Sequence, residues 1–344
     1  MPELVANLSE DFLFPKLHGL WSRSLTGAAL ERLVQSGREE TLSRALGALG
    51  IDVSRREQVQ KQIVAAHIAE LAGVRRLADA RTARFYSAFV ERHLFENLKT
   101  VLHYHYLPEH GVSMQFLLIE APGLPRFDAE ALLAARSTHQ LYRNLPEHAC
   151  RESLLPVLVE LEDSHDILQA ECRLDRMFYT ALLAAAEGLP RSTRQAGCDL
   201  VRTEVDIVNL VMVLRNAVMY RLSAEALRGL CLEGGRHLPA RALEPLLEAK
   251  AVPALVAALP RPYGALLEPW VSGELYLSEN ALWNHLYRLA YRLFTDYDHP
   301  AASVVAFPFL KRFEMLNIGR VFEGIHFGLG PADIHEMMIG AGHV

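Results

Sequence analysis

The chain has 344 residues, of which 51% are hydrophobic and 22% are charged. This length and apolar content suffice for one large domain or for two or three smaller ones with substantial cores. The formal net charge of -6 argues against a general nucleic-acid binder, which would carry a basic excess.

Targeting and redox signals are weak. The N-terminal residues MPELVANLSEDFLF contain acids and no basic segment ahead of an apolar run, so we expect no signal peptide. No stretch reaches about 18 uninterrupted apolar residues, so we expect no membrane span. The four cysteines show no zinc-type spacing, and we expect them to be reduced thiols of a cytosolic protein.

The first third of the chain predicts helices. Apolar residues recur at helical spacing between residues 14 and 49, where Thr26 is a candidate N-cap. Residues 54–106 contain no proline and predict one very long helix or two helices joined near Gly73. Residues 108–127 are rich in Pro and Gly and predict a loop, with MQFLLIE (114–120) as a short helix or strand.

The rest of the chain continues the helical pattern. Long helices are expected over 152–187, 204–215, 279–294 and 303–323, and a last helix is expected from Pro331. A Gly-Gly loop and two short helices separate the second and third of these, up to Leu259. Strand-type alternation is nearly absent, which predicts an all-α protein.

Residues 204–215, EVDIVNLVMVLR, are almost continuously apolar and predict a buried helix. Glu204, Asp206, Asn209 and Arg215 interrupt the apolar run, and each buried polar group needs a partner. Asp206 and Arg215 are about two and a half helical turns apart, so they face opposite ways and cannot pair with each other. Their partners must therefore come from elsewhere in the chain.

The chain also resembles itself. Glu171 precedes Asn209 by 38 positions, and Glu279 precedes Asn317 by the same number. A fainter third copy, ERHLFENLKTVL, places Asn97 in the asparagine position and Leu94 in the acidic position. The period of roughly 110 residues is too long for a solenoid of helix pairs. It predicts three similar helical lobes, which we place at residues 1–127, 128–262 and 263–344, the last partly completed by N-terminal helices. The repeated positions are Asn97, Glu171, Asp175, Glu204, Asp206, Asn209, Arg215, Glu279, Glu314 and Asn317.

The ordered motifs resemble a known family. The chain is similar to the component of the vacuolar/archaeal-type (V/A-type) ATPase that is called C in prokaryotes and d in eukaryotes, and the resemblance covers essentially its whole length. The matching motifs are Leu25-Thr26 after a short Arg-containing helix, Glu171/Leu174/Asp175/Tyr179, Glu204/Asp206/Asn209/Arg215, Gly234-Gly235 with Leu238, Tyr263, Lys311/Glu314/Asn317/Ile318, and Gly328-Leu329 with Ile334. Trp283 stands where the motif containing Asp175 would place an acid.

The resemblance implies a pseudo-threefold, funnel-shaped arrangement of the lobes and a non-catalytic socket in the central stalk of a rotary ATPase. Such a socket links the shaft of the catalytic head to the membrane proteolipid ring for ion transport, of H⁺ or Na⁺, coupled to ATP hydrolysis or synthesis. The resemblance also implies a soluble monomer within a hetero-oligomer, peripheral on the cytoplasmic face of the membrane.

Local motifs for other chemistry are missing. No phosphate-binding GxxxxGK[ST] or GxGxxG motif occurs, and the ExxH at Glu162–His165 is only one part of a di-iron site, which also needs two further helix carboxylates. We therefore expect no catalytic, cofactor or metal site. The loop residues Gly234, Gly235 and Arg236 are candidates for partner contact.

The alternative function is an all-α enzyme that uses Glu204, Asp206 and Arg215 as a buried acid–base cluster. Recurrence of the acid and the asparagine in other repeats favours structural roles, because active sites are rarely repeated within one chain. The two hypotheses differ in where these side chains should point: to separate partners within the scaffold, or into one water-accessible cleft.

Overall fold

The protein is helical throughout the part described by the computed structural model, which covers residues 2–107, 117–271 and 273–340, with backbone alone for residues 2–11. Within these ranges no strand occurs, which confirms the all-α prediction. The α-helices are α1 (Pro2–Trp21), α2 (Gly27–Ser36), α3 (Glu39–Ala48), α4 (Arg56–Arg75), α5 (Ala80–Val90), α6 (Arg92–Tyr106), α8 (Ala129–Leu133), α9 (Thr138–Asn144), α10 (Arg151–Ser164), α11 (Ile167–Glu187), α12 (Arg191–Arg215), α13 (Ala224–Leu230), α14 (Ala240–Leu247), α15 (Val252–Ala258), α16 (Tyr263–Leu267), α17 (Leu275–Phe294), α18 (Ala302–His326) and α19 (Pro331–Met337).

Two predicted long helices are broken. Residues 54–106 form α4, α5 and α6, so the prediction of one helix, or of two joined at Gly73, is wrong. Gly73 lies inside α4, and the break comes at Asp79, whose carboxylate accepts hydrogen bonds from the backbone N–H groups of Arg81 and Thr82 and caps α5. Residues 152–187 likewise divide into α10 and α11, because His165 adopts a left-handed conformation and Asp166 caps α11.

The loop region before α8 is described only in part. Residues 108–116, including the first three residues of MQFLLIE, lie outside the described ranges. Ile119 and Glu120 belong to neither a helix nor a strand.

Three long helices, α6, α12 and α18, carry Asn97, Asn209 and Asn317, and we call them the central helices. The helices that precede them in the repeat, α4, α11 and α17, we call the leading helices. Each central helix packs against the leading helix of another repeat: α6 on α11, α12 on α17 and α18 on α4. These contacts form a closed cycle.

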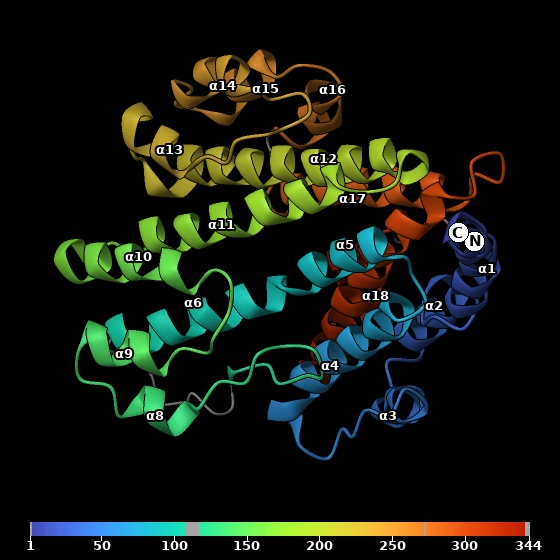
Figure 1. Cartoon of the computed structure of the whole chain (residues 1–344). Helices are drawn as coiled ribbons and strands as arrows, with labels where there is room; N and C mark the ends of the chain where they lie inside the picture. The colour runs from blue at the N-terminus through green and yellow to red at the C-terminus, as the bar shows by residue number, and fades with distance from the viewer. Residues whose placement is uncertain (1, 108–116, 272, 341–344) are drawn as a thin grey trace.

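The short helices lie around this framework. Figure 1 shows α13 to α16 stacked along the side of α12, and α8 and α9 beside α6. The N-terminal helices α2 and α3 pack on the last long helix, α18.

The buried apolar residues form two clusters. The larger one runs from Leu13 to Ile339 and is continuous across the predicted lobe boundaries. The smaller one joins α2, α3 and α4 to α18 and α19 through residues such as Leu46, Ile63 and Phe322. The division into three lobes and the funnel shape stay predictions.

Candidate functional site

The central helices meet through one buried ionic cluster. Arg92, Glu204 and Arg312 each lie five positions before the asparagine of their own repeat. Oε1 of Glu204 lies 2.9 Å from Nη2 of Arg92 and 2.6 Å from Nη1 of Arg312. The Tyr179 hydroxyl on α11 donates to the same oxygen at 3.0 Å and accepts from Arg92 at 3.3 Å. One carboxylate therefore connects four helices.

The electrostatics of the cluster follow from its burial. The Glu204 side chain is 0% exposed. Burial alone would raise its pKa, but the guanidinium groups of Arg92 and Arg312 outweigh burial and hold the pKa below its usual value. Glu204 is therefore a carboxylate, and the cluster has two cations for one anion.

The two guanidinium groups also lie against aromatic rings, and their charge helps to keep nearby histidines neutral. The guanidinium of Arg92 lies 4.6 Å from the ring centre of Phe178, and that of Arg312 lies 5.2 Å from that of Trp283. Burial first, and then the charges of Arg92 and Arg312, lower the pKa of His93 to about 3. His67, whose ring nitrogens have no hydrogen-bond partner among the described residues, also has a strongly lowered pKa.

The three asparagines make the same pair of hydrogen bonds. Each side-chain amide donates to a backbone carbonyl 22 or 23 residues later and accepts from the N–H of that same residue. Asn97 binds Ile119 at 2.8 and 2.7 Å, Asn209 binds Leu232 at 2.9 and 2.7 Å, and Asn317 binds Ile339 at 2.7 and 2.9 Å. Each asparagine thus fixes a backbone segment that returns to its central helix 22 or 23 residues later.

The acids three positions before the asparagines hold other loops. Asp206 accepts hydrogen bonds from the backbone N–H groups of His237 and Leu238 at 2.8 and 3.1 Å and from the Tyr263 hydroxyl at 2.9 Å. Burial raises the pKa of Asp206, and these bonds oppose the rise. Glu314 accepts from the N–H of Leu25 at 2.6 Å and pairs with Lys311. Leu94 occupies this position in the first repeat and can form no such bond.

The glycine loop is shaped by Asp206. A Cβ atom on Gly235 would lie 2.2 Å from Oδ1 of Asp206, so only glycine allows the loop to approach the carboxylate. Gly234 has a φ of +89°, which also favours glycine. Arg236 pairs with Asp199 at 3.0 Å, and its side chain is 34% exposed. Partner contact by Gly234, Gly235 and Arg236 stays a prediction.

Polar pairs six positions after the asparagines join neighbouring repeats. Arg215 makes a bidentate pair with Glu279 at 2.7 and 2.9 Å, between α12 and α17. His103 lies 2.8 Å from Glu171, between α6 and α11. Glu323 pairs with Arg56 at 2.8 Å, between α18 and α4. Each of the three helix contacts in the closed cycle therefore carries a polar pair at this position.

Asp175 binds within the same α6–α11 contact, where its carboxylate lies 2.7 Å from Nζ of Lys99. The equivalent position in the third repeat is Trp283, which packs against Arg312 instead of pairing with a cation.

Sequence analysis identified Glu204 but missed Arg92 and Arg312. The signal was present, because all three occupy the same position relative to the asparagines. It was overlooked because an acid in one copy and a base in the others do not look alike. The sequence analysis singled out Arg215, Glu279 and Glu171 but predicted none of the inter-repeat pairs. It named neither Arg56 nor Glu323, where the charges are reversed relative to Arg215–Glu279.

The predicted acid–base cluster does not come together. Glu204, Asp206 and Arg215 each bind a different set of partners, and the Glu204 carboxylate is out of contact with solvent. No group of three or more His, Cys, Asp or Glu side chains suited to a metal ion occurs in the described ranges. No described helix is long and apolar enough to cross a membrane.

A family model matches this chain along most of its length, and two known proteins match part of it. The family model described as ATP synthase (C/AC39) subunit matches residues 13–337. The C subunit of the A-type ATP synthase of Methanosarcina barkeri is 30% identical over 152 residues, which covers 44% of this chain and 41% of the relative. That of Methanococcoides burtonii is 25% identical over 163 residues, covering 47% and 43%. The aligned segments thus span less than half of each relative.

Replacing Asn209 with leucine should remove both bonds to Leu232 and leave a buried N–H and C=O without partners. We expect a loss of about 2–6 kcal/mol in the free energy of unfolding, at about 1–3 kcal/mol for each of the two unsatisfied groups. Urea titration measures this loss. Gln195→Leu on the exposed side of the same helix is the control and should change stability by less than about 0.5 kcal/mol. Equal stability of the two variants would show that the asparagine contacts contribute nothing.

The buried neutral histidines predict loss of stability in acid. The pKa of His93 is lowered in the folded state from 6.5 to about 3, so unfolding takes up a proton below pH 6.5. Its contribution is complete above pH 6.5 and should fall by about 1.4 kcal/mol per pH unit below it. Denaturant titrations at pH 7.5, 6 and 5 measure the slope. His93→Gln should make it shallower, whereas His139→Gln, at an exposed position, should leave it unchanged. An unchanged slope in His93→Gln would contradict the assignment.

Proposed function

Because the chain belongs to the ATP synthase (C/AC39) subunit family, we propose that it is a non-catalytic socket subunit in the central stalk of a rotary V/A-type ATPase. In this role it links the central-shaft subunits of the catalytic head to the membrane proteolipid ring. It passes torque between them during ion transport coupled to ATP hydrolysis or synthesis.

One observation supports this role above the others: the helix contacts close on themselves. α6 packs on α11, α12 on α17 and α18 on α4, and a polar pair joins each contact. A closed cycle of long helices resists twisting better than an open array, because no end is free to shear. Close-packed interiors are also hardly compressible. A protein that transmits torque needs this stiffness.

The same observations disfavour the alternative of an all-α enzyme with Glu204, Asp206 and Arg215 as acid and base. Glu204 neutralises two arginines, Asp206 binds a loop and a tyrosine, and Arg215 pairs with Glu279. A reacting substrate would need these groups in one accessible cleft. Their separate partners support a scaffold instead.

The location and contacts of the protein are part of the proposal. We place it on the cytoplasmic face of the membrane, held there through the rotor ring. The three repeats act as similar lobes around the cycle of helix contacts. The surface that they form can fit a ring of many identical subunits through complementary shape and charge. The loop Gly234–Arg236 is the proposed contact with a partner.

Purification from membranes tests the role. A tagged full-length chain should bring down the ATPase head and the proteolipid ring, identified by mass spectrometry after mild detergent extraction. Recovery of the tagged chain alone would contradict the proposal.

A variant pair tests the loop. Arg236→Glu should reduce recovery of one partner several-fold, because it reverses the charge of a half-exposed residue beside Asp199. Arg241→Glu, at an exposed position on α14, makes the same charge change and should not reduce recovery. Equal recovery with both variants would exclude the loop as a contact.

A further inference from the structure

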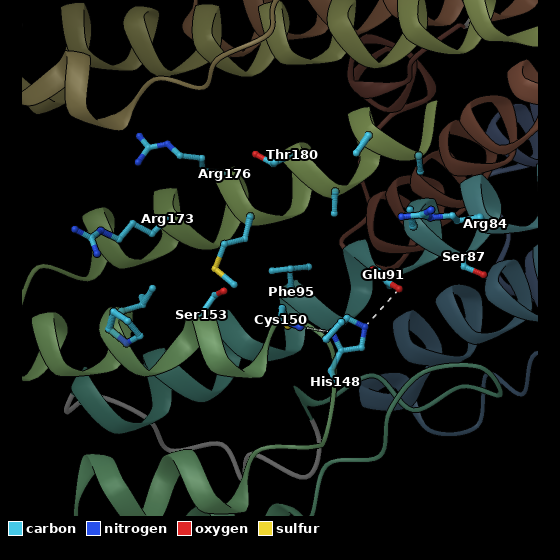
Figure 2. A pocket seen from close by; sticks show the side chains of 18 residues that line it. Arg84, Ser87, Glu91, Phe95, His148, Cys150, Ser153, Arg173, Arg176 and Thr180 are labelled. Atoms are coloured by element: carbon cyan, nitrogen blue, oxygen red, sulfur yellow. Dashed lines mark hydrogen bonds and ion pairs between the residues drawn. The ribbon is translucent and has the colours of Figure 1, made fainter. Parts of the chain in front are cut away.

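A cavity of about 780 Å³ lies between α5, α6, α10 and α11, apart from the ionic cluster of the central helices (Figure 2). Apolar side chains, including Phe95, Val157 and Met177, form much of its wall. Three arginines also line it: Arg84, Arg173 and Arg176. The cavity is large enough for an organic molecule of moderate size.

A cysteine, a histidine and a glutamate in the wall of this cavity form a chain of contacts. Nδ1 of His148 lies 3.1 Å from Sγ of Cys150, and Nε2 of the same ring lies 3.4 Å from Oε1 of Glu91. The backbone N–H of Cys150 also points to Nδ1, at 3.3 Å. Figure 2 shows the ring between the two partners. This is the order of nucleophile, base and orienting acid that activates a thiol.

Two features of the fold lie beside the Cys150 sulfur and bear on its reactivity. The thiol proton can pass to Nδ1 of His148, and Glu91 stabilises the imidazolium that forms. Cys150 directly precedes α10, whose N-terminus carries a partial positive charge. The bond to the Cys150 sulfur, and next the bond to Glu91, raise the pKa of His148 to about 10.

The other cysteines lack this environment. Burial raises the pKa of Cys172 to about 12 and that of Cys231 to about 11, and it also raises the pKa of Cys198. These three thiols stay protonated and are covered by the core. Cys150 is the half-buried one, and it lines the cavity.

The arginines define the ligand that the cavity would take. Arg173 pairs with Glu160, whereas Arg176 donates to the carbonyl groups of Gly229 and Cys231. Within the described residues, no carboxylate forms an ion pair with Arg84 or Arg176. The wall therefore carries positive charge that a ligand with carboxylates would neutralise.

We propose that Cys150 is a modification site at which a small disulfide carrying carboxylates transfers one of its thiols to the protein. The Cys150 thiolate attacks one sulfur of the disulfide RS–SR, a Cys150–SR bond forms, and the RS–SR bond breaks. The leaving RS⁻ takes the proton held by His148 and departs as RSH. The oxidant is the small disulfide itself, and no other reactant is needed.

The test uses the reduced full-length chain and glutathione disulfide at pH 7. Intact mass and peptide mapping should show one added glutathionyl group, on Cys150, and none in Cys150→Ser. His148→Gln should slow the reaction by roughly tenfold or more, because an unassisted cysteine is only a few per cent thiolate at this pH. Circular dichroism and a melting curve confirm that each variant is folded.

A second disulfide tests the role of the arginines. Cystamine is a cationic disulfide. For each disulfide, the rate of reaction with Cys150 is divided by its rate with a short cysteine peptide. This ratio should be lower for cystamine than for glutathione disulfide. Arg84→Gln should bring the normalised rates of cystamine and glutathione disulfide closer together.

Three results would overturn the proposal. These are equal rates for the folded wild type and His148→Gln, modification of another cysteine first, or a relative rate for cystamine that matches or exceeds that of glutathione disulfide.

Discussion

A single buried carboxylate, that of Glu204, organises the structure. It lies between Arg92 and Arg312, which come from the other two central helices, and it accepts the Tyr179 hydroxyl from a leading helix. A carboxylate without solvent contact needs such partners, because removing one member of a buried pair costs about 3–5 kcal/mol. Apolar packing brings long helices together with little directional preference. The ionic cluster adds direction, because it is satisfied only when the three central helices meet at the same level.

The other polar contacts extend outward from this level. The acidic position of the repeat lies two residues after the cluster residue on each central helix. In the second and third repeats it is occupied by Asp206 and Glu314, and each binds a loop. The asparagines then fix the loops that return 22 or 23 residues later, and the pairs six positions beyond them join neighbouring repeats. Apolar burial supplies most of the stability of such a body. The polar contacts specify which helix lies beside which.

Much of this could be predicted from the sequence, and the failures have physical causes. The all-α class followed from helical periodicity, and the repeat spacing located Asn97, Asn209 and Asn317. The breaks before α5 and α11 were missed because Asp79 and Asp166 act as N-caps inside segments whose helical periodicity is otherwise continuous. Arg92 and Arg312 were missed because the repeat keeps the position of a charge but not its sign. The partners of Asp206 lie 31 to 57 residues away along the chain and depend on the tertiary fold.

Comparison of single and triple variants of the central cluster tests this account most directly. Glu204→Gln should lower the free energy of unfolding by about 3–5 kcal/mol, because two buried guanidinium groups lose their anion. The triple variant Arg92→Met, Glu204→Leu, Arg312→Met should lose much less than the sum of its single changes, since no charge is left unpaired. Glu187→Gln, in the exposed pair with Arg202, is the control and should cost less than about 1 kcal/mol. Additive losses across the triple variant, or a loss below about 1 kcal/mol for Glu204→Gln, would contradict the central role of the cluster.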